Sequence, residues 1–239
     1  GNLAEAEGLF KKGAKLKGRE PSPGSYRTLA GKFAKAGELD KAESYLQNAL
    51  TASEAAGEAE LADAVRIELI GLFIDRGKYD EAIGPLEKKL VDDDEKRAAV
   101  IAKLSAGTGK LTNRDISEFQ DDYGMSKNKG VIGQLSRAYF EAGRDDKELI
   151  RSINLINLLQ FSTKKDDWHN ETWIEWRLRE VSAYFKLGDS FGRGDAFKVA
   201  ITIIQNGIIT PGLIDQYDET LPGSKSEFER VLQNAKAKQ

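Results

Sequence analysis

The segment "AGTGK" (106–110) contains glycines and a lysine, the residue types that build a phosphate-binding loop. In such a loop, glycine lets backbone N–H groups approach the phosphates, and a Ser or Thr follows the lysine. Here Leu104 stands in place of the motif's first glycine, and Leu111 stands in place of the Ser or Thr. An apolar stripe at helical spacing also precedes the segment, where the motif needs a strand. We therefore predict a turn between two helices and no bound cofactor.

His169 is the one histidine of the chain, and Asp166 and Asp167 precede it closely. An imidazole beside a carboxylate can act as a general base. A lone histidine cannot form a site with two imidazole ligands, and the absence of cysteine removes thiolate ligands and cysteine nucleophiles. We therefore predict no metal site and no catalytic residue, with His169 at the surface or at the start of a helix.

Three tryptophans, Trp168, Trp173 and Trp176, lie close to this histidine in the sequence. Trp173 and Trp176 are three residues apart, so they share one face of a helix. We predict that this face packs against a neighbouring helical hairpin. The alternative is an exposed aromatic patch that binds a partner, because large aromatic side chains dominate many interfaces.

The composition is typical of a soluble protein whose charges lie on solvated helix faces. Charged residues make up 31% of the 239 residues, and the formal net charge is −3. The chain therefore lacks the basic excess that binds nucleic-acid phosphates. No apolar run reaches the roughly 18 residues of a membrane-spanning helix. We predict a soluble protein with no nucleic-acid partner and no membrane-spanning segment.

The chain begins "GNLAEAEGLF", without an initiator Met and already inside a helical pattern. We interpret this as a chain shortened at its N-terminus, where a signal peptide, a lipid anchor or further repeats preceded Gly1. A cytoplasmic location and an extracytoplasmic one, after removal of an N-terminal signal, both fit the composition.

Two segments align without a gap: "YRTLAGKFAKAGELDKAESYLQNAL" (26–50) and "RIELIGLFIDRGKYDEAIGPLEKKL" (66–90). Residue 26 aligns with residue 66, so the offset is 40 residues. The identical pairs are Leu29 and Leu69, Gly31 and Gly71, Phe33 and Phe73, Gly37 and Gly77, Asp40 and Asp80, Ala42 and Ala82, Leu46 and Leu86, and Leu50 and Leu90. A fixed internal period of this length indicates a stacked-repeat architecture.

Each copy has the pattern of a helical hairpin. Leu29 and Phe33 recur at helical spacing before the turn, and Ala42 and Leu46 recur at helical spacing after it. Gly37 stands where the first helix must end and the chain must reverse, a place that favours glycine. Such a hairpin cannot bury its apolar face alone, so neighbouring hairpins must stack on it.

The pattern resembles the tetratricopeptide repeat. In the first copy the matching residues are Tyr26, Leu29, Ala30, Phe33, Gly37, Ala42, Leu46 and Ala49. The second copy departs at Ile70, where a small residue is expected, and at Lys89, where the last Ala is expected. The offset exceeds the family's period of about 34 residues, which indicates longer helices around residues 51–65. The resemblance implies an all-α fold, a right-handed superhelical solenoid of antiparallel helix pairs.

The resemblance weakens along the chain and divides it into three parts. Residues 1–92 hold a truncated first copy and two strong copies, residues 93–128 a degenerate helical hairpin, and residues 129–239 degenerate repeats with a C-terminal capping helix. That last helix, 226–239, carries Phe228 and Val231 on one face and polar residues elsewhere, as a terminal element needs.

The resemblance also implies where a partner binds, because the first helix of each hairpin lines the concave groove in proteins of this family. Carried over residue by residue, the groove positions are Arg27, Gly31, Ala34, Ile67, Gly71, Ile74, Arg137, Phe140, Leu178 and Phe185. The Lys, Asn and Arg set with which one subfamily grips a terminal carboxylate is absent. Small and apolar residues instead suit a helix or extended segment that is inserted by hydrophobic contact and oriented by Arg27 or Arg137.

Gly31 and Gly71 occupy the same groove position in the two strong copies. Glycine within a helix costs about 1 kcal/mol relative to alanine. We expect this cost to be accepted because another segment approaches the backbone closely, either from a partner or from the chain itself.

We therefore predict a non-enzymatic scaffold that binds a protein or peptide partner in this groove. One alternative is a structural or oligomerising module, including a homo-oligomer, and another is a groove filled by the chain's own inserts at 51–65 and 92–128. A third is an all-helical enzyme or small-ligand binder near the tryptophans and His169.

Overall fold

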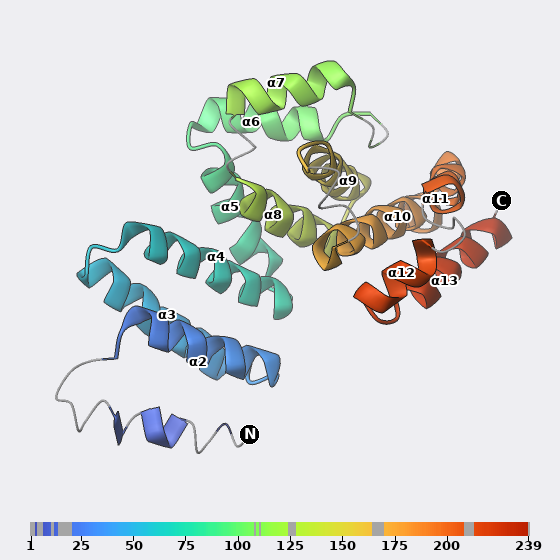
Figure 1. Cartoon of the computed structure of the whole chain (residues 1–239). Coiled ribbons are helices and arrows are strands. Elements are labelled where there is room, and N and C mark those ends of the chain that lie inside the picture. Colours follow the sequence, from blue (N-terminus) through green and yellow to red (C-terminus); the bar gives the residue numbers. More distant parts are fainter. Residues whose placement is uncertain are drawn as a thin grey trace. The chain divides into compact units, whose positions relative to one another are not determined.

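A computed structural model describes residues 3, 7–10, 12–13, 21–107, 109, 111–123, 128–163, 170–207 and 213–238. Every regular element among these residues is a helix, and none is a strand (Figure 1). This confirms the predicted all-α class. The chain forms two compact units, Gly1–Ala82 and Ile83–Gln239. The boundary falls inside helix α5, Tyr79–Leu90.

The first unit contains helices α2 (Pro23–Lys35), α3 (Leu39–Ala55) and α4 (Ala59–Asp75). Gly37 and Gly57 have φ angles of +78° and +71° in the two intervening turns. A left-handed conformation at such a turn favours glycine, so the chain reverses at Gly37 as the repeat pattern predicts, and it reverses again at Gly57, which the pattern did not identify. The long helices α3 and α4 also confirm the expected lengthening around residues 51–65.

Aromatic stacking and small residues form the core of this unit. The rings of Phe33 and Tyr45 lie parallel, with their centroids 5.5 Å apart. Ala42 and Ala49 are fully buried, which lets α3 pack closely within the core. Burial, together with a hydrogen bond of 2.8 Å that the Tyr45 hydroxyl donates to Glu7, raises the pKa of Tyr45 to about 12.

In the described residues of the second unit, the end of α5 is followed by eight further helices. These are α6 (Asp94–Leu104), α7 (Asn113–Tyr123), α8 (Lys129–Ala142), α9 (Asp146–Phe161), α10 (Glu171–Phe191), α11 (Gly194–Gly207), α12 (Leu213–Thr220) and α13 (Ser224–Ala237). Side-chain caps fix several starts, since Asn170 Oδ1 accepts from the backbone N–H of Trp173 at 2.9 Å. Thr112 and Asp115 likewise form a reciprocal cap before α7.

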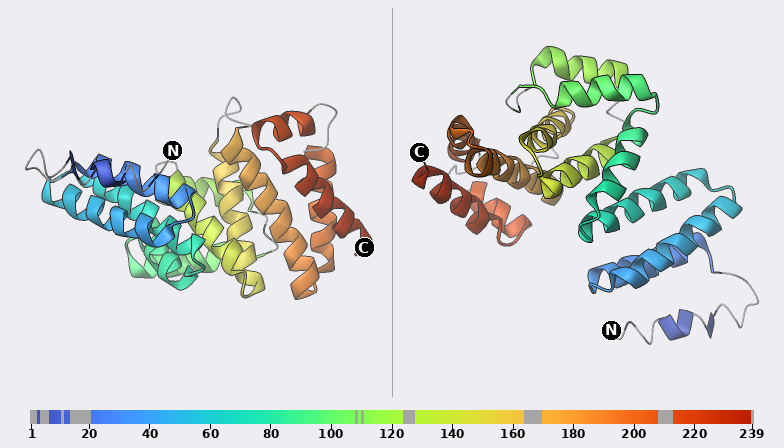
Figure 2. Two further views of the ribbon diagram at one scale, coloured as in Figure 1. Left: turned by 90° about the horizontal axis from the view of Figure 1, so that it is seen from below. Right: turned by 180° about the vertical axis from the view of Figure 1, so that it is seen from behind.

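From α8 to α11, each helix packs against the next one along the chain (Figure 2). Helix α9 contacts both α8 and α10, and α11 contacts both α10 and α13. The approach of α10 to α11 is close, because a Cβ on Gly188 would lie 2.6 Å from the ring of Phe197. Phe228 and Val231 of α13 are buried in the core, in keeping with the capping role expected of the last helix.

The segment "AGTGK" lies between α6 and α7, as predicted, although Thr108 and Lys110 lie outside the described residues. Gly107 and Gly109 have φ angles of +77° and +82°. The carbonyl of Gly109 accepts hydrogen bonds from Asn157 Nδ2 at 2.9 Å and from the Tyr184 hydroxyl at 2.8 Å. These two bonds hold the turn against α9 and α10. The glycine at 109 therefore has a structural role, and no bound phosphate is needed to account for it.

The hairpin of α6 and α7 lies in the second unit. Arg151 Nε donates to Ser105 Oγ at 2.6 Å, and Asn154 Nδ2 donates to the Leu104 carbonyl at 2.8 Å. These bonds tie the end of α6 to the middle of α9. No helix of the described residues is long and apolar enough to cross a membrane.

Candidate binding cavity

The two aligned glycines of the predicted groove have different environments. Gly31 is exposed on α2, and no atom lies within 4 Å of the position of an added Cβ. Gly71 is buried in α4, as is Ile74, of which 3% is exposed. No segment of the described chain therefore approaches Gly31 closely, which leaves its backbone open to a partner, whereas Gly71 and Ile74 are buried.

The other groove positions of the first unit have partners within it. Arg27 Nη2 forms an ion pair of 2.6 Å with Glu68, which joins α2 to α4. Ala34 packs against the core of the unit, and Ile67 is half-buried. Arg27 is thus already engaged by a carboxylate of its own chain.

The groove positions of the second unit come together at one cavity. Arg137 and Phe140 of α8 and Leu178 and Phe185 of α10 line a cavity of about 890 Å³. The lining residues are Lys129, Gly130, Gly133, Gln134, Arg137, Phe140, Thr172, Glu175, Trp176, Leu178, Arg179, Ser182, Phe185, Lys186, Glu227, Arg230 and Val231. They come from α8, α10 and α13, and on each helix they recur every three or four residues, as one helical face requires.

Apolar and aromatic side chains form one part of the wall. Trp176, Leu178, Phe185 and Val231 are all partly or fully buried where they line the cavity. Trp176 lies where α8 and α10 meet, with its indole Nε1 3.9 Å from the Cβ position of Gly133. Such a wall can bury apolar side chains of a ligand.

Three of the cavity's cations already have contacts with the chain itself. Lys129 Nζ donates to the Ser162 carbonyl at 2.9 Å, and Arg230 Nη2 pairs with Glu227 at 2.5 Å. Lys186 Nζ lies 4.0 Å from the centroid of the Phe140 ring. A cation over an aromatic face is a favourable contact, so Lys186 is held against α8.

Arg179 differs from these cations. Within the described part of the chain it makes neither a hydrogen bond nor an ion pair, although it is half-buried. Burial and the neighbouring positive charge of Arg137 lower the pKa of Arg179 to about 10, against the opposite effect of Glu175 and Glu141. Arg179 is not among the groove positions that the repeat pattern assigns, although its spacing from Glu175 and Ser182 places it on the groove face of α10.

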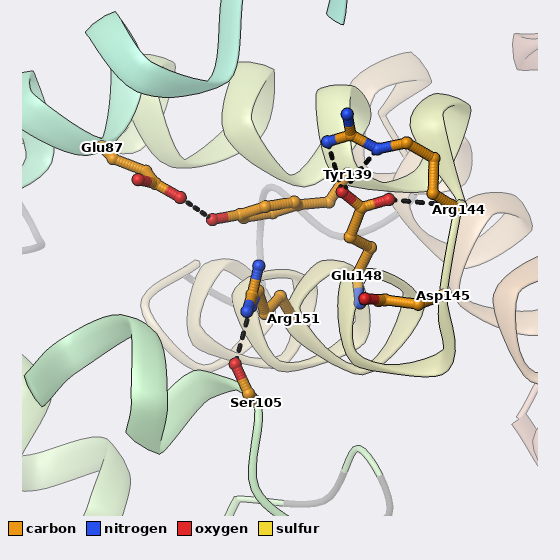
Figure 3. A network of polar contacts seen from close by, with 7 residues as sticks. All are labelled: Glu87, Ser105, Tyr139, Arg144, Asp145, Glu148 and Arg151. Atoms are coloured by element: carbon orange, nitrogen blue, oxygen red, sulfur yellow. Dashed lines mark hydrogen bonds and ion pairs between the residues drawn. The ribbon is translucent and has the colours of Figure 1, made fainter. Parts of the chain in front are cut away.

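The opposite side of α8 is fixed by a polar network (Figure 3). The fully buried Tyr139 donates its hydroxyl proton to Glu87 of α5, and the guanidinium of Arg151 lies 5.3 Å from the centroid of its ring. Burial, with the Glu87 bond, raises the pKa of Tyr139 well above its usual value. Because Tyr139 is anchored away from the cavity, α8 is held with Arg137 and Phe140 on the cavity side.

The same network continues at the start of α9. Glu148 accepts hydrogen bonds from Arg144, at 2.8 Å from the backbone N–H and 2.9 Å from Nε (Figure 3). Its own backbone N–H donates to Asp145 Oδ1 at 2.8 Å. These contacts order the loop between α8 and α9. They also stabilise the buried carboxylate of Glu148, which therefore has a structural role.

The tryptophans have separate roles. Trp173 is 7% exposed and packs against Tyr217 in the core, whereas Trp176 lines the cavity. Asp166, Asp167, Trp168 and His169 lie outside the described residues, so the structure does not test the alternative of a site around His169. Among the described residues, no group of three or more His, Asp or Glu side chains is arranged to hold a metal ion.

Comparison with known proteins gave no match: no protein-family model, no curated protein and no solved structure is significantly similar to this chain.

Proposed function

We propose that the second unit binds a segment of a partner protein in the cavity between α8, α10 and α13. One observation carries this proposal: Arg137, Phe140, Leu178 and Phe185 line the same cavity. The first two belong to α8 and the last two to α10, and the resemblance to the repeat assigned all four to one surface.

The chemistry of the lining supports binding rather than catalysis. The wall combines aromatic and aliphatic side chains with guanidinium and ammonium groups, and none of the lining residues is His, Asp, Tyr or Cys. The volume is within the range of about 300–1,000 Å³ that is usual for ligand sites, so it fits a few side chains rather than a whole domain. A segment that inserts apolar side chains matches this lining.

The finer fold is part of the proposal. The turns at Gly37 and Gly77, the buried Ala42 and Ala82, and the packing of successive helices support a tetratricopeptide-like array. In a right-handed solenoid of such hairpins, α8 and α10 are first helices whose exposed faces line the concave surface.

A matched pair of variants tests the binding surface. Peptides are selected from a random display library on the whole chain, and their affinity is measured by fluorescence anisotropy. Phe140→Glu should weaken binding by about tenfold or more, because it places a charge in the apolar wall. Phe161→Glu makes the same change at a side chain that is 56% exposed and outside the cavity, and it should leave the affinity unchanged.

Circular dichroism melting of both variants separates lost binding from lost folding. Equal affinities for the wild-type chain and for folded Phe140→Glu would contradict the proposal. A second copy of the chain is the competing occupant: light scattering would then show an oligomer that Phe140→Glu dissociates.

A further inference from the structure

The cavity differs in charge from the chain as a whole. Five of its lining residues are Lys or Arg and two are Glu, whereas the formal net charge of the chain is −3. Positive charge gathered in a partly apolar recess attracts an anionic group and favours its binding over binding elsewhere on the surface.

Among these cations, Arg179 is the one whose N–H groups are most available for hydrogen bonds to a ligand. Lys129, Lys186 and Arg230 already contact carbonyl, ring or carboxylate groups of the chain. Arg179 makes no hydrogen bond or ion pair within the described residues, and Arg137 adds a like charge beside it. A partly buried cation beside a like charge is stabilised when an anion binds it.

The geometry of the Arg179 guanidinium indicates which kind of anionic group it binds. Guanidinium groups bind carboxylates through two parallel N–H···O bonds, which are among the stronger hydrogen bonds in proteins. Phe140, Leu178 and Phe185 place apolar surface along the same cavity. Glu175 and Glu227 in the lining disfavour a continuous polyanion such as a nucleic-acid backbone, while one isolated carboxylate can avoid them.

We infer that the bound segment carries an Asp or Glu side chain, which Arg179 binds with the help of the Arg137 charge, next to an apolar side chain on the wall of Leu178 and Phe185. This inference rests on the proposed function and specifies the chemistry of the partner.

A double-mutant cycle tests it with the peptides selected above. Each selected peptide is compared with a version in which Asp or Glu is replaced by Asn or Gln, against the wild-type chain and Arg179→Met. We expect the amide replacement to weaken binding to the wild-type chain by about tenfold. Binding to Arg179→Met should be weak for both peptides, with little difference between them.

Arg114→Met is the matched control, since Arg114 is an exposed arginine on α7 outside the cavity. It should bind both peptides as the wild-type chain does. Arg179→Met should remain folded with an unchanged or higher melting temperature, because the removed charge has no ion-pair partner in the described residues and methionine keeps an apolar stem.

The outcomes separate the two proposals. Peptides that Phe140→Glu weakens but that contain no acidic residue, or that bind Arg179→Met normally, would overturn the inference and leave the proposed function standing. Peptides that Phe140→Glu does not weaken would overturn both. Displacement of the peptide by a single-stranded oligonucleotide at equal concentration would identify a nucleic-acid site and also overturn the inference.

Discussion

Two features of the turn between α6 and α7 favour glycine at position 109: its left-handed backbone conformation and the close approach of a buried side chain. Replacing Gly109 by alanine tests both. Its φ angle of +82° is unfavourable for a residue with a Cβ. An added Cβ would also lie 2.9 Å from Cγ2 of Ile153, which is itself fully buried. Gly107 provides the control, since it has a φ angle of +77° and no atom within 4 Å of its Cβ position.

The two substitutions should therefore differ in size. A left-handed conformation costs a non-glycine residue about 1–2 kcal/mol, which is the whole effect expected for Gly107→Ala. Overpacking against a buried side chain adds about 1–3 kcal/mol. For Gly109→Ala we expect a loss of about 2–5 kcal/mol in the free energy of unfolding, because both terms apply.

Urea unfolding followed by circular dichroism measures both values on the whole chain. Because the chain has two units, the unfolding transition of the second unit must be separated from that of the first. The urea midpoint of the first unit should be the same in both variants as in the wild-type chain. Equal losses for Gly107→Ala and Gly109→Ala would refute the docking of this turn on α9. A neutral Gly109→Ala would refute the left-handed conformation as well.

Three further predictions concern other parts of the chain. Gly31→Ala should raise the stability of the first unit by about 0.5–1 kcal/mol in urea unfolding, since Gly31 is an exposed helical residue with open space around it; a loss would show that another segment contacts it. Tyr139→Phe should lower the stability of the second unit by about 1.5–3 kcal/mol, because Glu87 loses a buried donor, and an unchanged midpoint would argue against the bond. Deleting 224–239 should expose Ile201 and cause aggregation detectable by light scattering, whereas a monomeric truncated chain would contradict the capping role of α13.

The helical class and the hairpin turns could be predicted because local sequence determines them. Gly37 and Gly77 end helices through a conformation that few other residues adopt, and Ala42 and Ala82 are fully buried as small residues. The division of the chain could not be predicted in the same way. It depends on contacts of the α6–α7 hairpin with α9, which are made by single polar side chains rather than by a periodic pattern.

The candidate site was predictable in part for a similar reason. The resemblance to a known repeat implied a common surface for Arg137, Phe140 and Phe185, and periodicity added only which face of each helix they share. Periodicity does not say which charged residues on that face have partners. Arg27 and Arg179 look equivalent in the sequence, but Arg27 is paired with Glu68 and Arg179 is unpaired among the described residues.

The weakening of the repeat after residue 92 also has a physical explanation in the second unit. Glu180 stands where the repeat pattern expects Leu, yet it is only 4% exposed. Arg177 pairs with it at 2.5 Å, and Gln160 of α9 donates to it at 2.9 Å. A buried carboxylate is tolerated only when its partners are present together, so the packing of α9 against α10 depends on all three side chains at this contact. A comparison of single positions with the repeat pattern counts Glu180 as a mismatch, although α9 and α10 pack against each other there.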